Sequence, residues 1–356
     1  MIVRAFITHK QAELFADCQD RFGVNLDTKS IAVSDGMGAT WQQKIWAQIL
    51  VDTYTENTDF SPSAETIKPL CQSWKAKVLD FIQKLKDTNA PINIIFRNER
   101  NLVAGRSAGA TFVGIRFKDN NWNGSVLGDS CLIEWNSSVT KFYTSQERDS
   151  FDSYPDYFDS DPLKEGKGTP RLISGTLIEG TILFLVSDPF SDFLLEHHKQ
   201  GDLPSYIHQL LSLSSHEDFE ALVCEWRKEG MHNDDTTLVI IENDNSEILT
   251  ISHADDLDEM IENEKSPQIS VPQVIEKTPT PHEIPIIGMN EAIKNFTIVQ
   301  NEEKDFIDDF LIEYQRCLQK KFPKFSGKYK FKWTKKAAEE ALNILLERYS
   351  ISKKNN

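Results

Sequence analysis

Residues 30–38 read SIAVSDGMG, a short apolar run that ends in Asp35 and passes directly into a glycine-rich turn. An apolar run of this length suits a buried strand, and the glycines permit a sharp turn after it. The next stretch carries apolar residues at the helical period: Ile45, Trp46, Ile49 and Leu50. The segment therefore predicts a strand that ends in a carboxylate and is followed by an amphipathic helix.

Outward from this segment, the pattern predicts helices and strands in separate groups. A second amphipathic helix is predicted at 67–85, where apolar residues recur every three or four positions. Short strands are predicted at 92–96 (INIIF), 109–117 (GATFVGIRF), within 125–135 (SVLGDSCLIEW, where Asp129 lies between two strands), 172–174 (LIS), 181–188 (TILFLVSD) and 236–242 (TTLVIIE), with two or three helices between 190 and 229. The N-terminus, MIVRAFITHK, predicts a first strand. Hairpin-linked strands with paired helices favour an α+β sandwich over alternating βαβ units.

The composition is globular, with 39% hydrophobic and 26% charged residues, and the net charge is −16. So acidic a chain argues against nucleic acid as its main partner. The five scattered cysteines form no CxxC pair, which argues against structural zinc and disulfides. No apolar run approaches twenty residues, so we expect no membrane span and a cytoplasmic protein.

Beyond the last predicted strand the composition changes twice. Residues 246–285 are rich in Asp, Glu, Ser and Pro and predict a linker, whereas 286–356 predict a small helical extension. The expected domains are thus 1–245, a linker and a tail. Residues 316–336 hold nine Lys or Arg, no acid and interleaved aromatics. They could form a small core beneath a lysine face, dock on an acidic surface, or bind nucleic acid.

A set of aspartates lies at the ends of the predicted strands: Asp20, Asp35, Asp129, Asp188 and Asp234. Any one of them alone would most often be a turn or helix-cap residue. Five carboxylates from separate segments can converge only if something offsets their repulsion, and a pair of divalent cations does that. Oxygen ligands without His or Cys favour Mg²⁺ or Mn²⁺. Such a pair can activate water and clamp a phosphoryl group.

These residues also carry a family resemblance. The series DCQDRFGV, AVSDGMG, SAGAT, VLGDS, FLVSDPFSDFL and NDDTTLVII, in this order, resembles the motifs of the type 2C metal-dependent protein phosphatases. The similarity spans about residues 5–242 and is greatest to a bacterial branch whose first motif reads CQD. It implies an α-β-β-α fold, in which helices flank two antiparallel sheets. It also implies a binuclear Mn²⁺ or Mg²⁺ site and no covalent phosphoenzyme.

Under this resemblance, Asp35 would bridge two metal ions, and the carbonyl of Gly36 would complete one coordination shell. Asp188 and Asp234 would hold one ion, and Asp20 would reach the other through water. Asp129 would help to hold a third, weaker ion. Catalysis would then depend on Asp35, Asp129 and Asp188. Asp235 stands where the family usually has Asn, so Asp234 and Asp235 could exchange roles, and Gly109 and Thr111 would serve packing.

The sequence departs from the family at positions around this site. Phe15 replaces the Arg that grips substrate phosphate in many members, which leaves His9 and Arg106 as candidates for that role. Met37, Ala39, Thr40, Cys131 and Pro189 also differ from common family residues. None of these changes removes a metal ligand. The polar stretch 145–170 is either a solvated surface loop or a flap that gates substrate.

We therefore expect hydrolysis of phosphoserine and phosphothreonine in proteins by a hydroxide that bridges two Mn²⁺ or Mg²⁺ ions. The natural partners would be a phosphorylated protein and an opposing Ser/Thr kinase. One alternative is a pseudophosphatase that binds without turnover. Another is a two-metal phosphohydrolase of a small metabolite.

Overall fold

The computed structural model describes residues 1–38, 40–136, 139–145, 155–164, 166–246 and 248–265, and two short strands further on. These two, β14 (Phe296–Thr297) and β15 (Ser352–Lys353), pair antiparallel in a second unit, Ser270–Asn356. The first compact unit is Met1–Ile269. The predicted helical tail and its basic segment at 316–336 lie outside the described residues.

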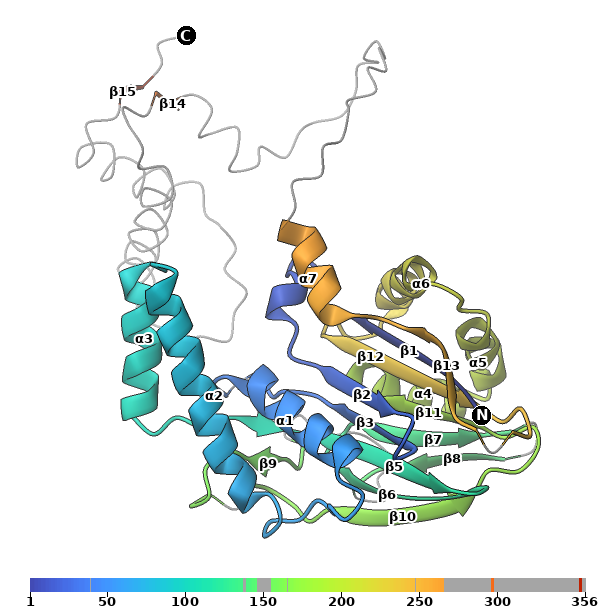
Figure 1. Cartoon of the computed structure of the whole chain (residues 1–356). Coiled ribbons are helices and arrows are strands. Elements are labelled where there is room, and N and C mark those ends of the chain that lie inside the picture. Colours follow the sequence, from blue (N-terminus) through green and yellow to red (C-terminus); the bar gives the residue numbers. More distant parts are fainter. Residues whose placement is uncertain are drawn as a thin grey trace, which may run out of the picture. The chain divides into compact units, whose positions relative to one another are not determined.

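Two sheets face each other in the first unit (Figure 1). The six-stranded sheet has the order β13-β1-β12-β11-β7-β8. Its strands are β1 (Ile2–Thr8), β7 (Cys131–Trp135), β8 (Thr140–Tyr143), β11 (Ile182–Val186), β12 (Thr236–Glu242) and β13 (Thr250–Ala254). All its pairings are antiparallel except β1 with β13, which is parallel.

The five-stranded sheet is antiparallel and has the order β10-β6-β5-β3-β2. Its strands are β2 (Arg21–Asn25), β3 (Ser30–Ser34), β5 (Phe112–Lys118), β6 (Asn121–Leu127) and β10 (Arg171–Thr176). A separate short pair joins β4 (Gly109–Ala110) to β9 (Phe158–Asp159).

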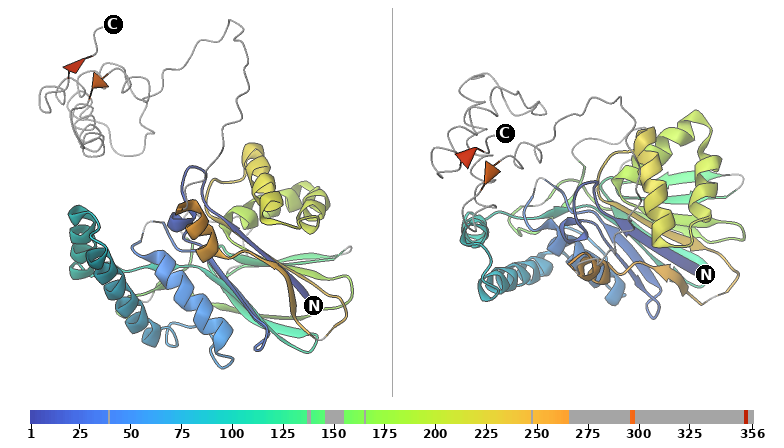
Figure 2. Two further views of the ribbon diagram at one scale, coloured as in Figure 1. Left: turned by 45° about the horizontal axis from the view of Figure 1, so that its top comes forward. Right: turned by 90° about the horizontal axis from the view of Figure 1, so that it is seen from above.

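Helices cover both outer faces of the sandwich (Figure 2). One face carries α1 (Gln43–Glu56) and α2 (Lys68–Asp87), from which α3 (Ile92–Val103) continues. The other face carries α4 (Asp188–Gln200), α5 (Leu203–Leu211) and α6 (His216–Glu229). A 3₁₀ turn, η1 (Phe15–Asp17), follows β1, and α7 (Leu257–Lys265) lies beside it.

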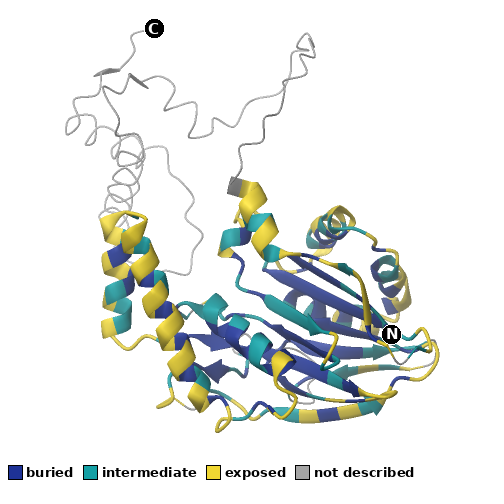
Figure 3. Cartoon of the chain, in the orientation of Figure 1, coloured by how far each residue is buried: buried dark blue, intermediate teal, exposed yellow. Residues whose placement is uncertain are grey.

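Alternating side chains of the central strands contribute to three apolar layers, and these strands are coloured mostly as buried in Figure 3. In β12, Val239 and Ile241 point between the sheets, whereas Leu238 and Ile240 pack against α4–α6. In β3, Ala32 packs under α1. Both faces of these strands are therefore buried, which explains why they are continuous apolar runs although the sheets are antiparallel. The predicted α-β-β-α sandwich is confirmed.

Two local predictions are wrong. Residues 92–96, predicted as a strand, begin helix α3, because the apolar positions continue at helical spacing and Ile95 and Asn98 face the domain. The side chain of Asn98 accepts hydrogen bonds from Trp41 Nε1 (3.1 Å) and Gln42 Nε2 (3.0 Å). A five-residue stretch with four apolar residues cannot by itself distinguish a strand from a helix turn.

The second error concerns the predicted linker, because residues 250–265 form β13 and α7 and pack on the first unit. For the stretch 145–170 the sequence left a solvated loop and a flap as alternatives, and residues 146–154 and 165 lie outside the described residues. Its strand β9 is buried, and Phe158 accepts a hydrogen bond from the Trp46 indole (2.9 Å). This part is not a solvated loop. Among the described residues, no helix has the length and apolar character needed to cross a membrane.

Candidate metal centre

Strand register brings Asp20 and Asp35 to the same end of the five-stranded sheet. Asp20 immediately precedes β2 and Asp35 immediately follows β3. Because Arg21 pairs with Ser34 in the antiparallel ladder, the two carboxylates flank one cross-strand pair. Asp35 is half-buried, whereas Asp20 is fully buried.

The six-stranded sheet brings its three aspartates to the corresponding end. Asp188 opens α4 two residues after β11, and Asp234 lies two residues before β12. These strand ends are adjacent, because Val186 pairs with both Leu238 of β12 and Cys131 of β7. Asp129, in the turn between β6 and β7, therefore lies at the same end.

A hydrogen bond across the sandwich joins the two groups. Thr237 of β12 donates its hydroxyl to Asp20 Oδ2 (2.8 Å), and its backbone N–H donates to Ser187 Oγ (2.9 Å). The end of β12 is thus tied both to the start of β2 and to the residue before Asp188. The five predicted aspartates form one candidate centre at this end of the sandwich.

The segment 109–111 holds Asp35 and the glycine turn that follows it. Thr111 donates its N–H to Asp35 O (2.9 Å), and its Oγ1 accepts from Asp35 N (3.3 Å). Gly109 O accepts from Met37 N (3.0 Å), and a Cβ on Gly109 would lie 2.9 Å from Met37 Sδ. These contacts support the interpretation that Gly109 and Thr111 serve packing and positioning.

Burial and mutual repulsion raise the pKa values of the carboxyl groups in this centre. Burial raises the pKa of Asp35 well above its ordinary range, and the charges of Asp188 and Asp129 add to the effect. The pKa values of Asp20 and Asp188 are also raised well above the ordinary range, first by burial and then by neighbouring aspartates. Burial raises the pKa of Asp129 from 3.8 to about 6.

The donor set fits divalent cations. Asp20 Oδ1 and Asp129 Oδ1 are buried and have no hydrogen-bond partner among the described residues. A cation would satisfy such oxygens and offset the repulsion that raises the pKa values. The centre supplies carboxylate and carbonyl oxygens, the ligands that Mg²⁺ and Mn²⁺ prefer. Within the described part of the chain, no three His, Cys, Asp or Glu side chains already form a closed ligand group.

Asp234 and Asp235 are placed differently although they are adjacent. Asp235 is 1% exposed, and its two oxygens accept the backbone N–H groups of Lys10 (2.9 Å) and Gln19 (2.8 Å). Both its oxygens thus have partners that fix the loop after β1. Asp234 is half-buried, and its Oδ1 contacts Lys10 Nζ at 2.8 Å. This arrangement favours Asp234 over Asp235 as the metal ligand.

Lys10 is a site residue that the sequence analysis missed. Burial lowers its pKa, but the hydrogen bond and charge of Asp234, together with Asp235 and Glu13, raise it to about 12. It is therefore a permanent cation beside the carboxylates. The sequence alone carries no signal for this role, because it arises from the pairing of β1 with β12: Thr8 pairs with Thr236, and the same register continued past the strands places Lys10 opposite Asp234.

The two residues predicted as phosphate-binding candidates lie elsewhere. His9 Nδ1 contacts Lys10 O at 2.7 Å, and its ring packs edge-on against Phe15, with centroids 4.5 Å apart. His9 is thus part of a packed cluster. Arg106 is exposed in the turn after α3.

The sequence matches the family model described as protein phosphatase 2C over residues 9–232. The match covers more than half of the 356 residues. The chain belongs to the protein phosphatase 2C family. This membership confirms the expected family and class, a protein serine/threonine phosphatase. The CQD branch stays a prediction, and Asp234 lies two residues beyond the matched region.

Solved phosphatase structures resemble this protein phosphatase 2C chain at low identity. The serine/threonine phosphatase PstP/Ppp of Mycobacterium tuberculosis is 15% identical, with a TM-score of 0.40 over 67% of this chain and 96% of that one. The structure of the PstP catalytic domain in complex with 2 manganese ions is 15% identical, with a TM-score of 0.41 over 67% of this chain and 96% of that one. Stp1 from Staphylococcus aureus is 13% identical, with a TM-score of 0.42 over 67% of this chain and 93% of that one. No curated protein matches the sequence significantly.

A first prediction concerns stability without metal. Because the folded-state pKa of Asp129 lies above its unfolded value, its stabilising contribution is complete below pH 3.8 and is lost as the pH rises through about 6. The pKa values of Asp20, Asp35 and Asp188 are also raised, so their contributions to stability are likewise lost as the pH rises. The melting temperature of the chelated protein should therefore fall between pH 5 and pH 7.5, and Mn²⁺ should restore it. Calorimetry that finds a flat or rising profile would contradict this.

A second prediction uses Asp35→Asn, which removes one charge but keeps the side-chain shape. Relief of repulsion should raise the melting temperature of the metal-free protein by about 2–4 °C, as expected for about 1 kcal/mol in a domain of this size. The rise that Mn²⁺ causes in wild type should be lost. Asp80→Asn, on the exposed side of α2, is the matched control and should change neither quantity.

Proposed function

We propose that this protein phosphatase 2C chain hydrolyses phosphoserine and phosphothreonine in proteins at the centre formed by the five strand-end aspartates. The supporting observation is a set of carboxylates with raised pKa values at one end of the sandwich, two of whose buried oxygens have no hydrogen-bond partner among the described residues. A centre of this kind is costly for the fold unless cations occupy it.

The residues proposed to hold the ions are Asp20, Asp35, the carbonyl of Gly36, Asp129, Asp188 and Asp234. When bound, two Mn²⁺ or Mg²⁺ ions, with a third at Asp129, would supply Lewis acidity and a water-derived nucleophile at neutral pH. The chain's own part is to fix the ligands. Asp35 is held by Thr111, and Asp20 by Thr237.

We further propose that Lys10 binds the substrate phosphate in place of the family Arg. Its ammonium group contacts Asp234 and acts on Asp188 through its charge. When Asp234 serves a cation, Lys10 loses its main partner and becomes free to meet an anion at the same place. Phosphate is an anion that a lysine binds well as a point charge.

The substrate proposal is a phosphorylated protein, with a Ser/Thr kinase as the opposing enzyme. The presence of every proposed ligand argues against a pseudophosphatase. A small phosphorylated metabolite remains the alternative substrate, and the cytoplasmic location stays a prediction. Of the three roles that the sequence leaves open for the basic segment at 316–336, we propose docking on an acidic surface.

A third prediction tests the reaction. The full chain should release phosphate from a phosphothreonine peptide in Mn²⁺, and chelation should stop the release. Asp35→Asn and Asp188→Asn should lower kcat at least a hundredfold with the fold intact by circular dichroism.

Asp129→Ala should lower kcat while calorimetry still detects the two tighter sites. Faster turnover of metabolite phosphates than of phosphopeptides would favour the metabolite alternative.

A fourth prediction tests Lys10. Lys10→Met should raise both the KM for phosphopeptide and the inhibition constant of inorganic phosphate about tenfold, because a charge-assisted contact to the anion is lost. Lys10→Arg should restore most of both. Lys75→Met, which removes an exposed lysine of α2, should leave them unchanged. Normal phosphate inhibition in Lys10→Met would show that Lys10 does not bind the anion.

A further inference from the structure

Residues 250–265, here called the strap, follow strand β12 and return to the N-terminal part of the chain. The strap consists of β13, a turn at 255–256 and α7. β13 adds a parallel strand to the free edge of β1, with Ile2 opposite Thr250 and Ala5 opposite Ala254. α7 then lies beside η1 (Figure 1).

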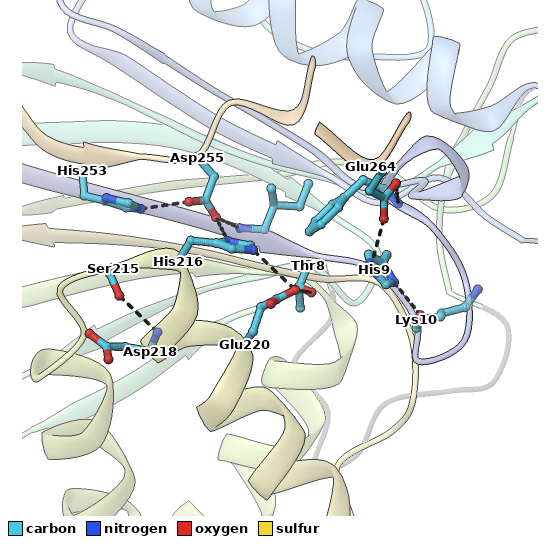
Figure 4. Close-up of polar contacts among 12 residues, drawn as sticks. Thr8, His9, Lys10, Ser215, His216, Asp218, Glu220, His253, Asp255 and Glu264 are labelled. Carbon is cyan, nitrogen blue, oxygen red and sulfur yellow. Dashed lines mark hydrogen bonds and ion pairs between the residues drawn. The ribbon is translucent and has the colours of Figure 1, made fainter. Parts of the chain in front are cut away.

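The first attachment of the strap is Asp255, whose side chain is 1% exposed. Its Oδ2 accepts the backbone N–H of Ile7 (2.8 Å), just where β13 has stopped pairing with β1. The same oxygen contacts His216 Nδ1 at 2.9 Å, and Oδ1 contacts His253 Nε2 at 2.9 Å (Figure 4). A buried carboxylate with three such partners is well satisfied.

The second attachment is Glu264, near the end of α7. Its Oε2 accepts the backbone N–H of Phe15 (2.9 Å), and its Oε1 lies 3.9 Å from His9 Nε2 (Figure 4). Phe15 is buried, and its ring lies between those of His9 and His216, with centroids 4.5 and 5.6 Å away. The two strap carboxylates thus hold backbone N–H groups on either side of the turn that follows β1.

This turn belongs to a loop, residues 9–20, that carries Lys10 and ends at Asp20. Its opposite side is fixed by the segment 233–235. There Asp235 accepts from Lys10 N and Gln19 N, and Asn233 Oδ1 accepts from Gln11 N (2.8 Å). The loop is therefore held between the segment before β12 and the strap.

We infer that the strap positions the loop 9–20 for metal and phosphate binding, with Asp255 and Glu264 as positioning residues. The role in metal and phosphate binding rests on the proposed function, whereas the contacts of the strap with the loop do not depend on it. It implies that the working phosphatase unit reaches residue 265. A chain that ended at 245 would leave the N–H groups of Ile7 and Phe15 without these acceptors, and buried unpaired donors are costly.

The test uses the full chain and three variants of α7. Glu264→Ala removes the acceptor for Phe15 N–H, whereas Glu264→Gln removes the charge and keeps an acceptor oxygen. Glu259→Ala is the matched control, because it makes the same change on the same helix at an exposed position. Amide hydrogen exchange and Mn²⁺ calorimetry are measured on each, with phosphopeptide kinetics in parallel.

In Glu264→Ala, the amides of Phe15 and Gln19 should exchange about tenfold faster, and Mn²⁺ should bind about tenfold more weakly. Exchange in the central strand β12 should not change. Glu264→Gln should recover most of both effects, and Glu259→Ala should resemble wild type. Unchanged loop exchange, or unchanged Mn²⁺ affinity, in Glu264→Ala would overturn the inference.

Failure of the proposed function would be seen separately. A wild-type chain that binds Mn²⁺ but releases no phosphate from the peptide would contradict phosphatase activity. The exchange and calorimetric results would still decide whether the strap positions the loop. Faster exchange in β12 of Glu264→Ala would indicate a global effect of that substitution. In that case the inference stands only if Glu264→Gln recovers fully and shows normal exchange in β12.

Discussion

The repulsion among the carboxylates at one end of the sandwich is the constraint on which the rest of this structure depends. Asp20, Asp35 and Asp188 are all raised in pKa by burial and by one another's charge. For Asp129, the change from 3.8 to about 6 corresponds to about 3 kcal/mol opposing the ionised form. A fold that is only marginally stable can hold such a centre only if the cost is offset elsewhere.

Two features offset this cost. The first is the pair of sheets with both faces covered, which places three apolar layers behind the centre. The second is local neutralisation, in which Thr237 donates to Asp20 and Lys10 contacts Asp234. Neither feature reaches the free oxygens of Asp20 and Asp129. The fold therefore holds these two oxygens in place without supplying a hydrogen-bond partner from the described residues, an arrangement that favours cation binding.

The strand-end carboxylates could be predicted because each follows or precedes an apolar run, and antiparallel register then brings them together. Sequence could not predict Lys10 in the same way, since its role depends on the pairing of β1 with β12, two strands far apart in the chain. The helix at 92–103 was missed because the four apolar residues of 92–96 were interpreted without the residues that follow them. The strap was missed because its polar composition resembles a linker, although Asp255 is buried against two other elements, through Ile7 of β1 and His216 of α6.

The elements of the centre differ in how firmly the fold fixes them. Asp35 and Asp188 adjoin central strands, so the packed core determines their positions. Lys10 lies on the loop 9–20, which is fixed in part by polar contacts from Asp235, Asn233 and Glu264. Regions held in this way open at lower free energy than core strands. The loop is therefore the part of the centre where a change outside the matched domain can alter metal and phosphate binding without unfolding the sandwich, because α7 contacts it directly and the sheets do not depend on α7.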